Sequence, residues 1–155
     1  MPEKPDNAFI SYVPGPLALR MISKVHTALY RMTGGSLGHQ LDGLDILLLT
    51  TIGFRTGKHY QTPMPYFQHP GGFLLIASNA GQKTNPGWYY NLIHQPGVEI
   101  QIRRNQIQAF ASILEGDERE AWWSRLIDLQ PRYIQYQQTT TRLIPLVLLE
   151  PKDSE

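Results

Sequence analysis

The chain contains no cysteine among its 155 residues, and this absence excludes disulfides, thiolate catalysis and cysteine-based metal sites. Charged residues are also few, at 17%, and a net charge of +1 gives no global field that would attract nucleic acid. No apolar run approaches the roughly 18 residues of a membrane-spanning helix, and the polar residues 1–7 do not resemble a signal peptide. We therefore expect a soluble, cytoplasmic protein that binds no nucleic acid.

The motifs of several enzyme classes are missing as well. The five histidines do not have the spacing of a His-Glu-x-x-His metal site, so we expect no metal. No Gly-x-Ser-x-Gly turn, Walker loop or Gly-x-Gly-x-x-Gly motif follows an apolar run. Without an evident nucleophile or metal, catalysis would have to be carried by a bound cofactor.

The length and the hydrophobic content of 41% are sufficient for one domain, residues 1–155, with a substantial core. Four prolines among the first 16 residues predict a loose arm over residues 1–15. Apolar residues then recur at three- and four-residue steps, which predicts an amphipathic helix over residues 16–33 with cations on its other face. Such a helix usually packs on a sheet, but it can also lie on a membrane or cover a substrate pocket.

Six apolar or alternating segments predict strands. They are residues 46–52, 60–68 and 73–78, the two arms of a hairpin over 98–114 that turns at Arg104-Asn105, and residues 143–149. The first three read as an antiparallel meander, and the prolines at positions 63 and 65 indicate a bulge or an edge. Antiparallel strands seldom leave their edges exposed, so we expect a closed or nearly closed barrel.

Two short helices are expected between these strands. One begins with Asn85 as its cap and Pro86 in the first helical position. The other covers residues 117–129, with Asp117 as its cap. The inward-facing side chains of the second helix are predicted to be Trp122, Leu126 and Leu129.

The segment from Leu47 to Pro63 is the centre of the predicted site. An apolar strand enters a turn that contains two glycines together with Arg55, Thr56 and Lys58. Glycine lets the backbone approach a ligand closely, and cations with free amides can bind an anion. Between residues 20 and 104 cations outnumber acids eight to three, which also favours an anionic ligand. On spacing alone, an ordinary surface hairpin remains the simpler interpretation.

Three motifs in order resemble the family of deazaflavin (coenzyme F420)-dependent nitroreductases and quinone reductases. The motifs are Leu-Leu-Thr-Thr-Ile-Gly-Phe-Arg-Thr-Gly-Lys over 48–58, Ile-Ala-Ser-Asn-Ala-Gly over 76–81 and Asn-Pro-Gly-Trp-Tyr-Tyr-Asn-Leu over 85–92. The tail is similar too, in Tyr133-Ile-Gln-Tyr136-Gln, Arg142-Leu-Ile-Pro145 and Glu150-Pro151. The resemblance covers nearly the whole chain after the N-terminal arm. It implies an α+β, mainly-β split β-barrel of about six antiparallel strands, with an N-terminal helix and two or three further helices.

The resemblance also implies a site and a reaction. Reduced F420 would donate a hydride to a quinone or nitroaromatic acceptor, with Arg55 and Lys58 on the phosphate and oligoglutamate tail of the cofactor. The implied cofactor-binding residues are Arg55, Thr56, Lys58, Thr62, Pro63, Ile76, Ala77, Ser78, Asn79, Lys83, Trp88 and Asn91. Asn85 would border the same site. The implied catalytic residues are Ser78, close to the acceptor, and Tyr133 and Tyr136, which would cover the ring and donate a proton or hydrogen bond.

Two other functions stay open. One is an FMN-binding split-barrel reductase, because Phe54, Tyr60 and Asn79 stand where the family commonly has basic residues. The other is a non-catalytic binder of a lipid, a haem or another flat apolar ligand, indicated by the cationic helix and the tyrosines. Peripheral membrane contact through the helix and a homodimer are compatible with the sequence. Each site residue also has a structural alternative, and Trp88 in particular fits a core position.

Overall fold

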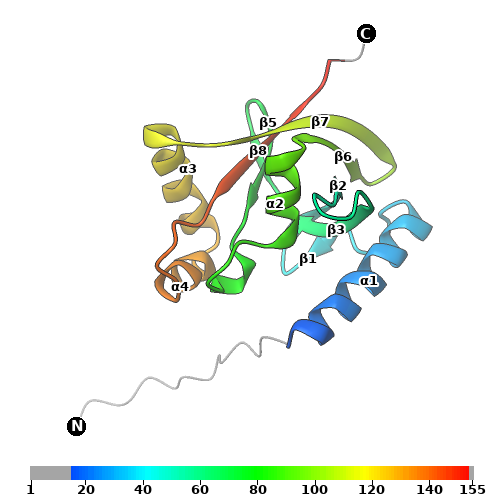
Figure 1. Ribbon diagram of the computed structural model, residues 1–155, viewed down its shortest axis with the longest axis horizontal. Coiled ribbons are helices and arrows are strands. Elements are labelled where there is room, and N and C mark those ends of the chain that lie inside the picture. The colour runs from blue at the N-terminus through cyan, green and yellow to red at the C-terminus, as the bar shows by residue number, and fades with distance from the viewer. Residues whose placement is uncertain (1–14, 154–155) are drawn as a thin grey trace.

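The computed structural model describes residues 15–153, so the predicted N-terminal arm lies almost entirely outside the described residues. The described chain forms antiparallel strands with helices between them (Figure 1). The helical elements are α1 (Pro16–Thr33), the 3-10 turn η1 (Asn79–Gly81), α2 (Gly87–His94), α3 (Gly116–Leu129) and α4 (Arg132–Gln138). The strands are β1 (Gln40–Leu41), β2 (Leu44–Ile52), β3 (His59–Pro65), β4 (Phe67–His69), β5 (Gly72–Ile76), β6 (Gly97–Ile102), β7 (Asn105–Ile113) and β8 (Leu146–Pro151).

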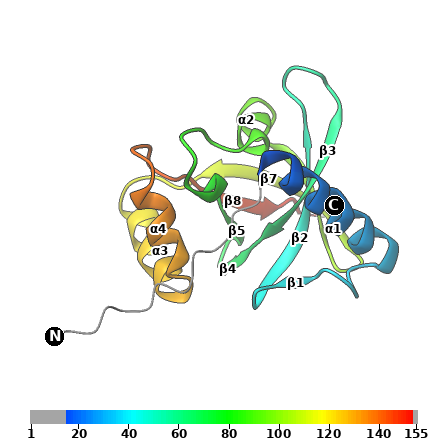
Figure 2. The same cartoon turned by 90° about the horizontal axis from the view of Figure 1, so that it is seen from below.

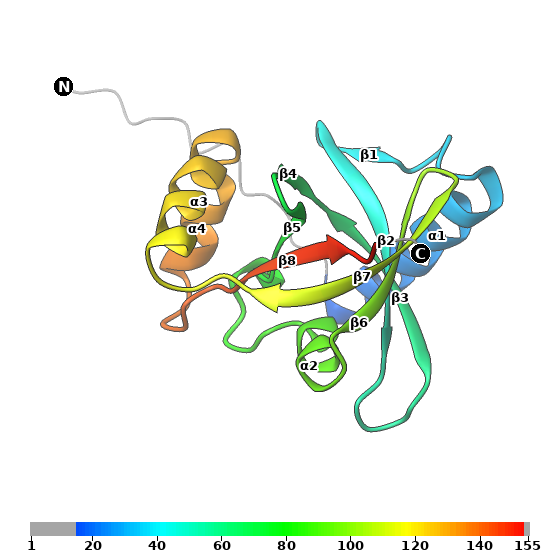
Figure 3. The same ribbon diagram turned by 90° about the horizontal axis from the view of Figure 1, so that it is seen from above.

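The strands form one antiparallel sheet that curls into a half-barrel (Figure 3). Their order is β1-β2-β6-β7-β8-β5-β4, and β3 pairs with β2 outside this path. The curl also brings β3 into contact with β5. The predicted antiparallel, mainly-β architecture is therefore confirmed, with α1 at one end of the sheet and α3 and α4 at the other.

The predicted meander over residues 46–78 is only partly correct. β2 pairs with β3, and β4 pairs with β5. The returning segment, however, is divided at Tyr66, whose N–H donates to the carbonyl of Asp45 at 3.0 Å. Pro63 and Pro65 pair with Leu48 and Ile46 of β2, but without an N–H neither proline can donate a hydrogen bond to a further strand. Within the described sheet β5 pairs with β8 on its other side, and β3 keeps an open edge as its prolines predicted.

Two buried clusters lie on opposite faces of β5 and β8. Because side chains alternate along a strand, Leu75 and Leu149 enter the cluster inside the barrel. Leu74 and Leu148 enter a second cluster with residues of α3 and α4, which pack together in Figure 2. Burial of each leucine contributes about 1.5–3 kcal/mol. Strand β5, which leads to Ser78, is thus packed against a buried cluster on each of its faces.

Helix α1 has the predicted bounds and ends at Gly34, whose φ of 57° is left-handed. Its anchor is Tyr30, which is fully buried. The Tyr30 hydroxyl accepts the N–H of Arg103 at 2.6 Å and donates to the carbonyl of Gln101 at 3.2 Å. The expectation that the apolar face of this helix packs on the sheet is wrong. The exposed large apolar side chains of α1 are Leu17, Leu19, Met21, Ile22, Val25, Leu29 and Met32.

The predicted turn of the β6–β7 hairpin is displaced by one residue. Ile102 pairs with Asn105, so the turn of the β6–β7 hairpin is Arg103-Arg104 and not Arg104-Asn105. Arg103 takes a φ of 55°, and the hydrogen bond from its N–H to Tyr30 holds this unusual conformation. The register of the hairpin is therefore set partly by helix α1, which lies far away in the sequence.

Helix α3 begins at Gly116 with Glu115 in the cap position, and no side chain caps it. The predicted Asp117 cap is therefore wrong. Leu126 is buried and Trp122 is half-buried, as predicted. Leu129 is 66% exposed because the helix ends there and the chain turns into α4. Among residues 15–153 no helix is long and apolar enough to span a bilayer.

Candidate functional site

The turn between β2 and β3 is closed by its own backbone. The N–H of Gly53 donates to the carbonyl of Lys58 at 2.7 Å, and the N–H of Gly57 donates to the carbonyl of Gly53 at 2.8 Å. The Thr56 hydroxyl accepts the N–H of Lys58 at 3.2 Å, so this predicted ligand residue stabilises the turn itself. The side chains of Arg55 and Lys58 are exposed, and in the described part of the chain neither pairs with a carboxylate. The turn therefore presents two uncompensated cations to solvent.

Helix α2 holds this turn in place through Asn91. The Asn91 side chain accepts the N–H of Phe54 at 3.2 Å and donates to the Thr51 hydroxyl at 3.1 Å. Phe54 stacks on His94 of the same helix, with ring centroids 4.5 Å apart. Trp88 is only 8% exposed and belongs to the core inside the barrel. Asn91 and Trp88 thus support the turn and the core.

Thr62 and Pro63 lie on β3, opposite Leu49 and Leu48 of β2. Both residues are half-buried. Since β3 has an open edge among the described strands, its backbone can contact a ligand bound beside it.

The second group of predicted residues lies at the end of β5 and in the loop that follows it. Ile76 and Ala77 are buried, and the N–H of Ala77 donates to the carbonyl of Pro145 at 3.0 Å. Ser78 follows in a half-buried position, and Lys83 is exposed farther along the loop. The chain therefore leaves the core at Ala77 and becomes accessible at Ser78.

The loop after Ser78 has an unusual backbone. Asn79, Ala80 and Gly81 have φ values of 47°, 53° and 75°, all in the left-handed region. Non-glycine residues rarely adopt this region, because the Cβ atom approaches the carbonyl oxygen. The Asn79 side chain donates to the carbonyl of Thr84 at 2.9 Å and so closes the loop. The side chain of Asn79, a predicted cofactor-binding residue, thus holds the conformation of its own loop.

A residue absent from the predicted site, Arg142, holds this loop. Its guanidinium donates to the carbonyls of Ala77 at 3.2 Å, Ser78 at 2.7 Å and Gln82 at 3.0 Å, and to Asn85 Oδ1 at 2.6 Å. Burial lowers the pKa of the Arg142 guanidinium below its ordinary value. The Arg142-Leu-Ile-Pro145 motif is visible in the sequence, but its partners lie between 57 and 65 residues away.

The same contact corrects the predicted start of α2. The helix begins at Gly87, with Pro86 in the cap position, and no side chain caps it. Asn85 was predicted to be the cap, but its side-chain oxygen accepts a hydrogen bond from Arg142 instead. A charged donor competes successfully with backbone N–H groups for this amide oxygen.

The two predicted tyrosines lie on α4. Tyr133 is 6% exposed and packs in one cluster with Ile76, and its ring meets Tyr136 edge-on at 5.8 Å. Burial raises the pKa of the Tyr133 phenol to about 12, so it stays protonated at neutral pH. The Thr139 hydroxyl at the end of the helix is shared between the carbonyls of Tyr136 at 2.8 Å and Gly81 at 3.0 Å. Helix α4 therefore contacts the loop that carries Ser78.

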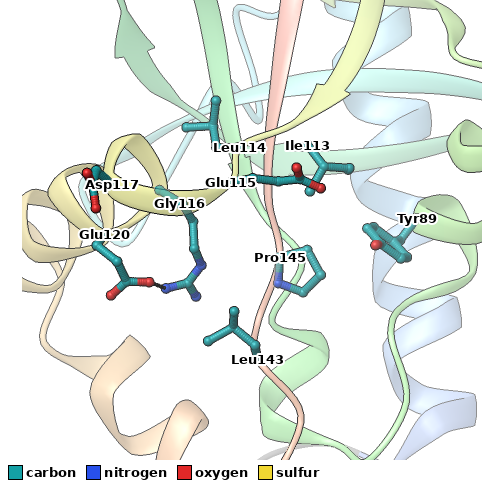
Figure 4. Close-up of a pocket in the computed structure, with 10 residues that line it drawn as sticks. Tyr89, Ile113, Leu114, Glu115, Gly116, Asp117, Glu120, Leu143 and Pro145 are labelled. Atoms are coloured by element: carbon teal, nitrogen blue, oxygen red, sulfur yellow. Dashed lines mark hydrogen bonds and ion pairs between the residues drawn. The ribbon is translucent and has the colours of Figure 1, made fainter.

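The structure places the predicted residues in two sets. One set lies on the β2–β3 turn and β3, the other lies at the end of β5 and on α4, and α2 joins the two. Neither of two surface cavities contains any of them. A cavity of about 460 Å³ lies between the start of α3 and the strand entry at Pro145, with Tyr89 on its other side (Figure 4). A second cavity of about 440 Å³ lies between α1 and β1 and is mainly apolar. The predicted residues instead flank the open edge of β3 and the end of β5.

Comparisons with known proteins agree on one family. The sequence profile described as F420H(2)-dependent quinone reductase matches residues 22–151. The F420H(2)-dependent quinone reductase Rv1261c of Mycobacterium tuberculosis is 34% identical over 130 residues, which are 81% of this chain and 87% of that protein.

Solved structures with related sequences share the fold. A structure described as an F420-H2 dependent reductase (FDR-A) is 36% identical, with a TM-score of 0.61 over 68% of this chain and 93% of that chain. Another, described as a domain-swapped dimer, is 33% identical, with a TM-score of 0.64 over 87% of this chain and 99% of that chain. These similarities confirm the predicted family resemblance and the split-barrel fold.

Proposed function

Since the chain belongs to the F420H(2)-dependent quinone reductase family, we propose that it transfers a hydride from reduced coenzyme F420 to a quinone-type acceptor. The observation that carries this function is the pair of exposed cations, Arg55 and Lys58, on a turn fixed by α2. We also propose that residues 1–155 act as one domain, because a single sheet carries both sets of site residues.

The residues present fit this cofactor. Its phosphate and oligoglutamate tail are anions, and Arg55 and Lys58 can donate charge-assisted hydrogen bonds to them. Lys83, exposed on the loop after Ser78, adds a third cation. Thr62 and Pro63 on the open edge of β3 would line the groove for the ring, and the backbone of residues 76–78 would meet its polar edge. When bound, the reduced deazaflavin supplies the hydride.

The catalytic roles fall on Ser78 and on the tyrosines of α4. Ser78 is accessible where the chain leaves the core, so its hydroxyl can bind an oxygen of the acceptor. Tyr136 is half-buried and offers a ring on which a flat acceptor can stack. The Tyr133 phenol remains protonated and can donate a hydrogen bond to the reduced oxygen. A nitroaromatic acceptor fits the same flat, hydrogen-bonding site.

Four predicted ligands take indirect roles in this proposal. Asn91 and Thr56 orient the cationic turn, and Asn79 closes the loop that presents Ser78. Trp88 contributes to the core beneath them. Their substitution would change binding through the position of neighbouring residues.

Parallel fluorescence titrations with F420 and FMN test the cofactor, and the oxidation of reduced F420 by a soluble quinone tests the reaction. We expect F420 to bind more tightly than FMN and to turn over with the quinone. Tighter binding of FMN would support the alternative split-barrel reductase. Binding of haem or lipid without any reductase activity would support a non-catalytic role, and either result would reject the proposed function.

The exposed apolar face of α1 supports a second proposal, contact with an anionic lipid surface. Five of its apolar side chains are more than half exposed, up to 83% for Met32, and Arg20, Lys24 and Arg31 are exposed on the same helix. This combination of apolar and cationic groups suits the interface of an anionic bilayer. A quinone acceptor is itself soluble in lipid.

Flotation with vesicles of anionic and of neutral lipid tests this contact. The intact chain should float with anionic vesicles, and the variant Met21→Ser/Val25→Ser should not. A dimer is the competing occupant of the face, since one related structure is described as a domain-swapped dimer. Light scattering that shows a dimer dissociated by the same substitutions, without flotation, would replace the lipid proposal with self-association.

A further inference from the structure

All acceptors of the Arg142 guanidinium belong to one short segment, residues 77–85. They are three backbone carbonyls and one side-chain amide, at distances between 2.6 and 3.2 Å. None of them is a carboxylate, so this arginine does not neutralise an acid. The planar guanidinium, with its five N–H donors, fixes the directions in which the carbonyls of this segment point.

The fixed carbonyls determine where the neighbouring amides point. In a planar trans peptide the N–H is directed opposite to the C=O of the same unit. The carbonyls of Ala77 and Ser78 point to Arg142, so the N–H groups of Ser78 and Asn79 point away from it. Neither N–H donates to any residue of the described chain. Two adjacent free donors of this kind can bind a carbonyl oxygen or an oxyanion.

The middle of the same loop packs against the end of α4. The Thr139 hydroxyl lies 3.0 Å from the carbonyl of Gly81 and 2.8 Å from that of Tyr136, and its one proton is shared between them. Within the segment that Arg142 spans, Asn79 and Ala80 keep left-handed backbones that persist only where the surroundings hold them. Arg142 and Thr139 together link the loop to α4, which carries Tyr133 and Tyr136.

We propose that Arg142 is a positioning residue for hydride transfer, which holds the Ser78 and Asn79 amides ready to bind an oxygen of the cofactor ring or of the acceptor. This inference rests on the proposed function. Arg142 acts through the backbone and does not touch the reacting atoms. A lysine at this position keeps the charge but cannot span four acceptors with one ammonium group.

The test compares Arg142→Lys and Arg142→Ala with a control, Arg119→Lys. Arg119 is also buried and donates to one carbonyl, that of Ile144, at 2.7 Å, but it does not contact residues 77–85. Hydrogen exchange of peptides covering residues 77–85 is measured without cofactor. The dissociation constant of F420, and the kcat and KM with a soluble quinone, are measured at matched fractions of folded protein.

We expect exchange of the hydrogen-bonded amides of this loop, those of Gly81 and Gln82, to rise at least about tenfold in both Arg142 variants and to stay near wild type in the control. A weakened F420 dissociation constant would assign the bound oxygen to the cofactor ring. A lower kcat at unchanged F420 affinity would assign it to the acceptor. Addition of methylguanidinium to Arg142→Ala should restore part of the lost property.

Two results would overturn the inference while wild type remains active with reduced F420. One is loop exchange and kinetics within about twofold of wild type in Arg142→Ala. The other is an equal loss in Arg119→Lys, which would indicate general destabilisation. Wild-type protein that does not oxidise reduced F420 would instead reject the proposed function, and the exchange data would still show whether Arg142 orders the loop.

Discussion

The side-chain amide of Asn91 donates to the hydroxyl of Thr51 at 3.1 Å, and both side chains are almost completely buried, at 9% and 1% exposed. Asn91 also accepts the N–H of Phe54, the first residue after Gly53 in the cationic turn. One amide thereby joins α2 to the end of β2 and to the turn. The position of the two exposed cations, Arg55 and Lys58, consequently depends on a residue that carries no charge.

Substitution of Asn91 by alanine should lower stability and weaken cofactor binding together. It leaves the buried Thr51 hydroxyl and the partly buried Phe54 N–H without partners, and an unpaired buried group costs about 1–3 kcal/mol. Urea unfolding and F420 titration measure the two effects. Gln95→Ala, which removes an exposed amide just beyond the same helix, is the control and should change neither. Normal F420 affinity in stable, folded Asn91→Ala would show that the turn does not need this anchor.

Removal of both turn cations should weaken F420 binding with little effect on folding. Arg55 and Lys58 are exposed, so Arg55→Ala/Lys58→Ala removes no buried contact. Charged hydrogen bonds contribute about 1.5–3 kcal/mol each before screening, and added salt should reduce the difference from wild type. Titration at low and high ionic strength measures this. The control Arg125→Ala/Lys152→Ala removes the same charge elsewhere, and an equal loss there would indicate a nonspecific charge effect.

Much of the fold could be predicted because its signals are local. Alternating and apolar runs marked the strand regions, and the glycines around Arg55 marked the turn between β2 and β3. The buried run of β2 fits its position between β3 and β6. Such features depend on neighbours in sequence, so the sequence contains them directly.

The parts that were wrong or missed depend on distant partners. Asn85 has the sequence context of a helix cap, yet Arg142, 57 residues later, takes its side-chain oxygen. The hairpin turn shifts because Tyr30 binds Arg103, 73 residues away. Periodicity also identifies the apolar face of α1 without showing whether anything covers it. The sequence-based predictions therefore failed where a hydrogen bond from a residue far away in the sequence overrides the local preference.

Alanine at Gly81 should separate the Ser78 loop from α4. Its φ of 75° costs a non-glycine residue about 1–2 kcal/mol, and the added Cβ would collide with the Thr139 hydroxyl and lie 2.8 Å from the carbonyl of Tyr136. We expect a loss of roughly 2 kcal/mol or more in unfolding free energy, with a lower kcat. The control Gly87→Ala meets no atom within 4 Å and should be neutral or slightly stabilising. Equal melting temperatures for the two variants would show that the close packing of Gly81 against Thr139 and Tyr136 does not stabilise the protein.

Alkaline unfolding should report the burial of Tyr133. Desolvation raises the pKa of this phenol from 10.0 to about 12, so the folded protein holds the proton more tightly than the unfolded chain does. The protonated Tyr133 phenol therefore contributes to the free energy of unfolding. This contribution is fully present below pH 10.0 and is lost as the pH rises towards about 12. It follows that Tyr133 cannot produce a change in activity near neutral pH by losing its own proton.

The measurement is urea unfolding of wild type and Tyr133→Phe at about pH 9 and about pH 11. Wild type should lose about 1 kcal/mol more than the variant over this interval, because phenylalanine has no proton to release. The comparison of differences cancels the buried tyrosines common to both proteins, such as Tyr30 and Tyr66, and any constant cost of the missing hydroxyl. Equal losses would mean that the Tyr133 phenol is solvated in the folded protein. Tyr133 would then be an accessible group at the mouth of the site and not a buried donor held by the core beneath α4.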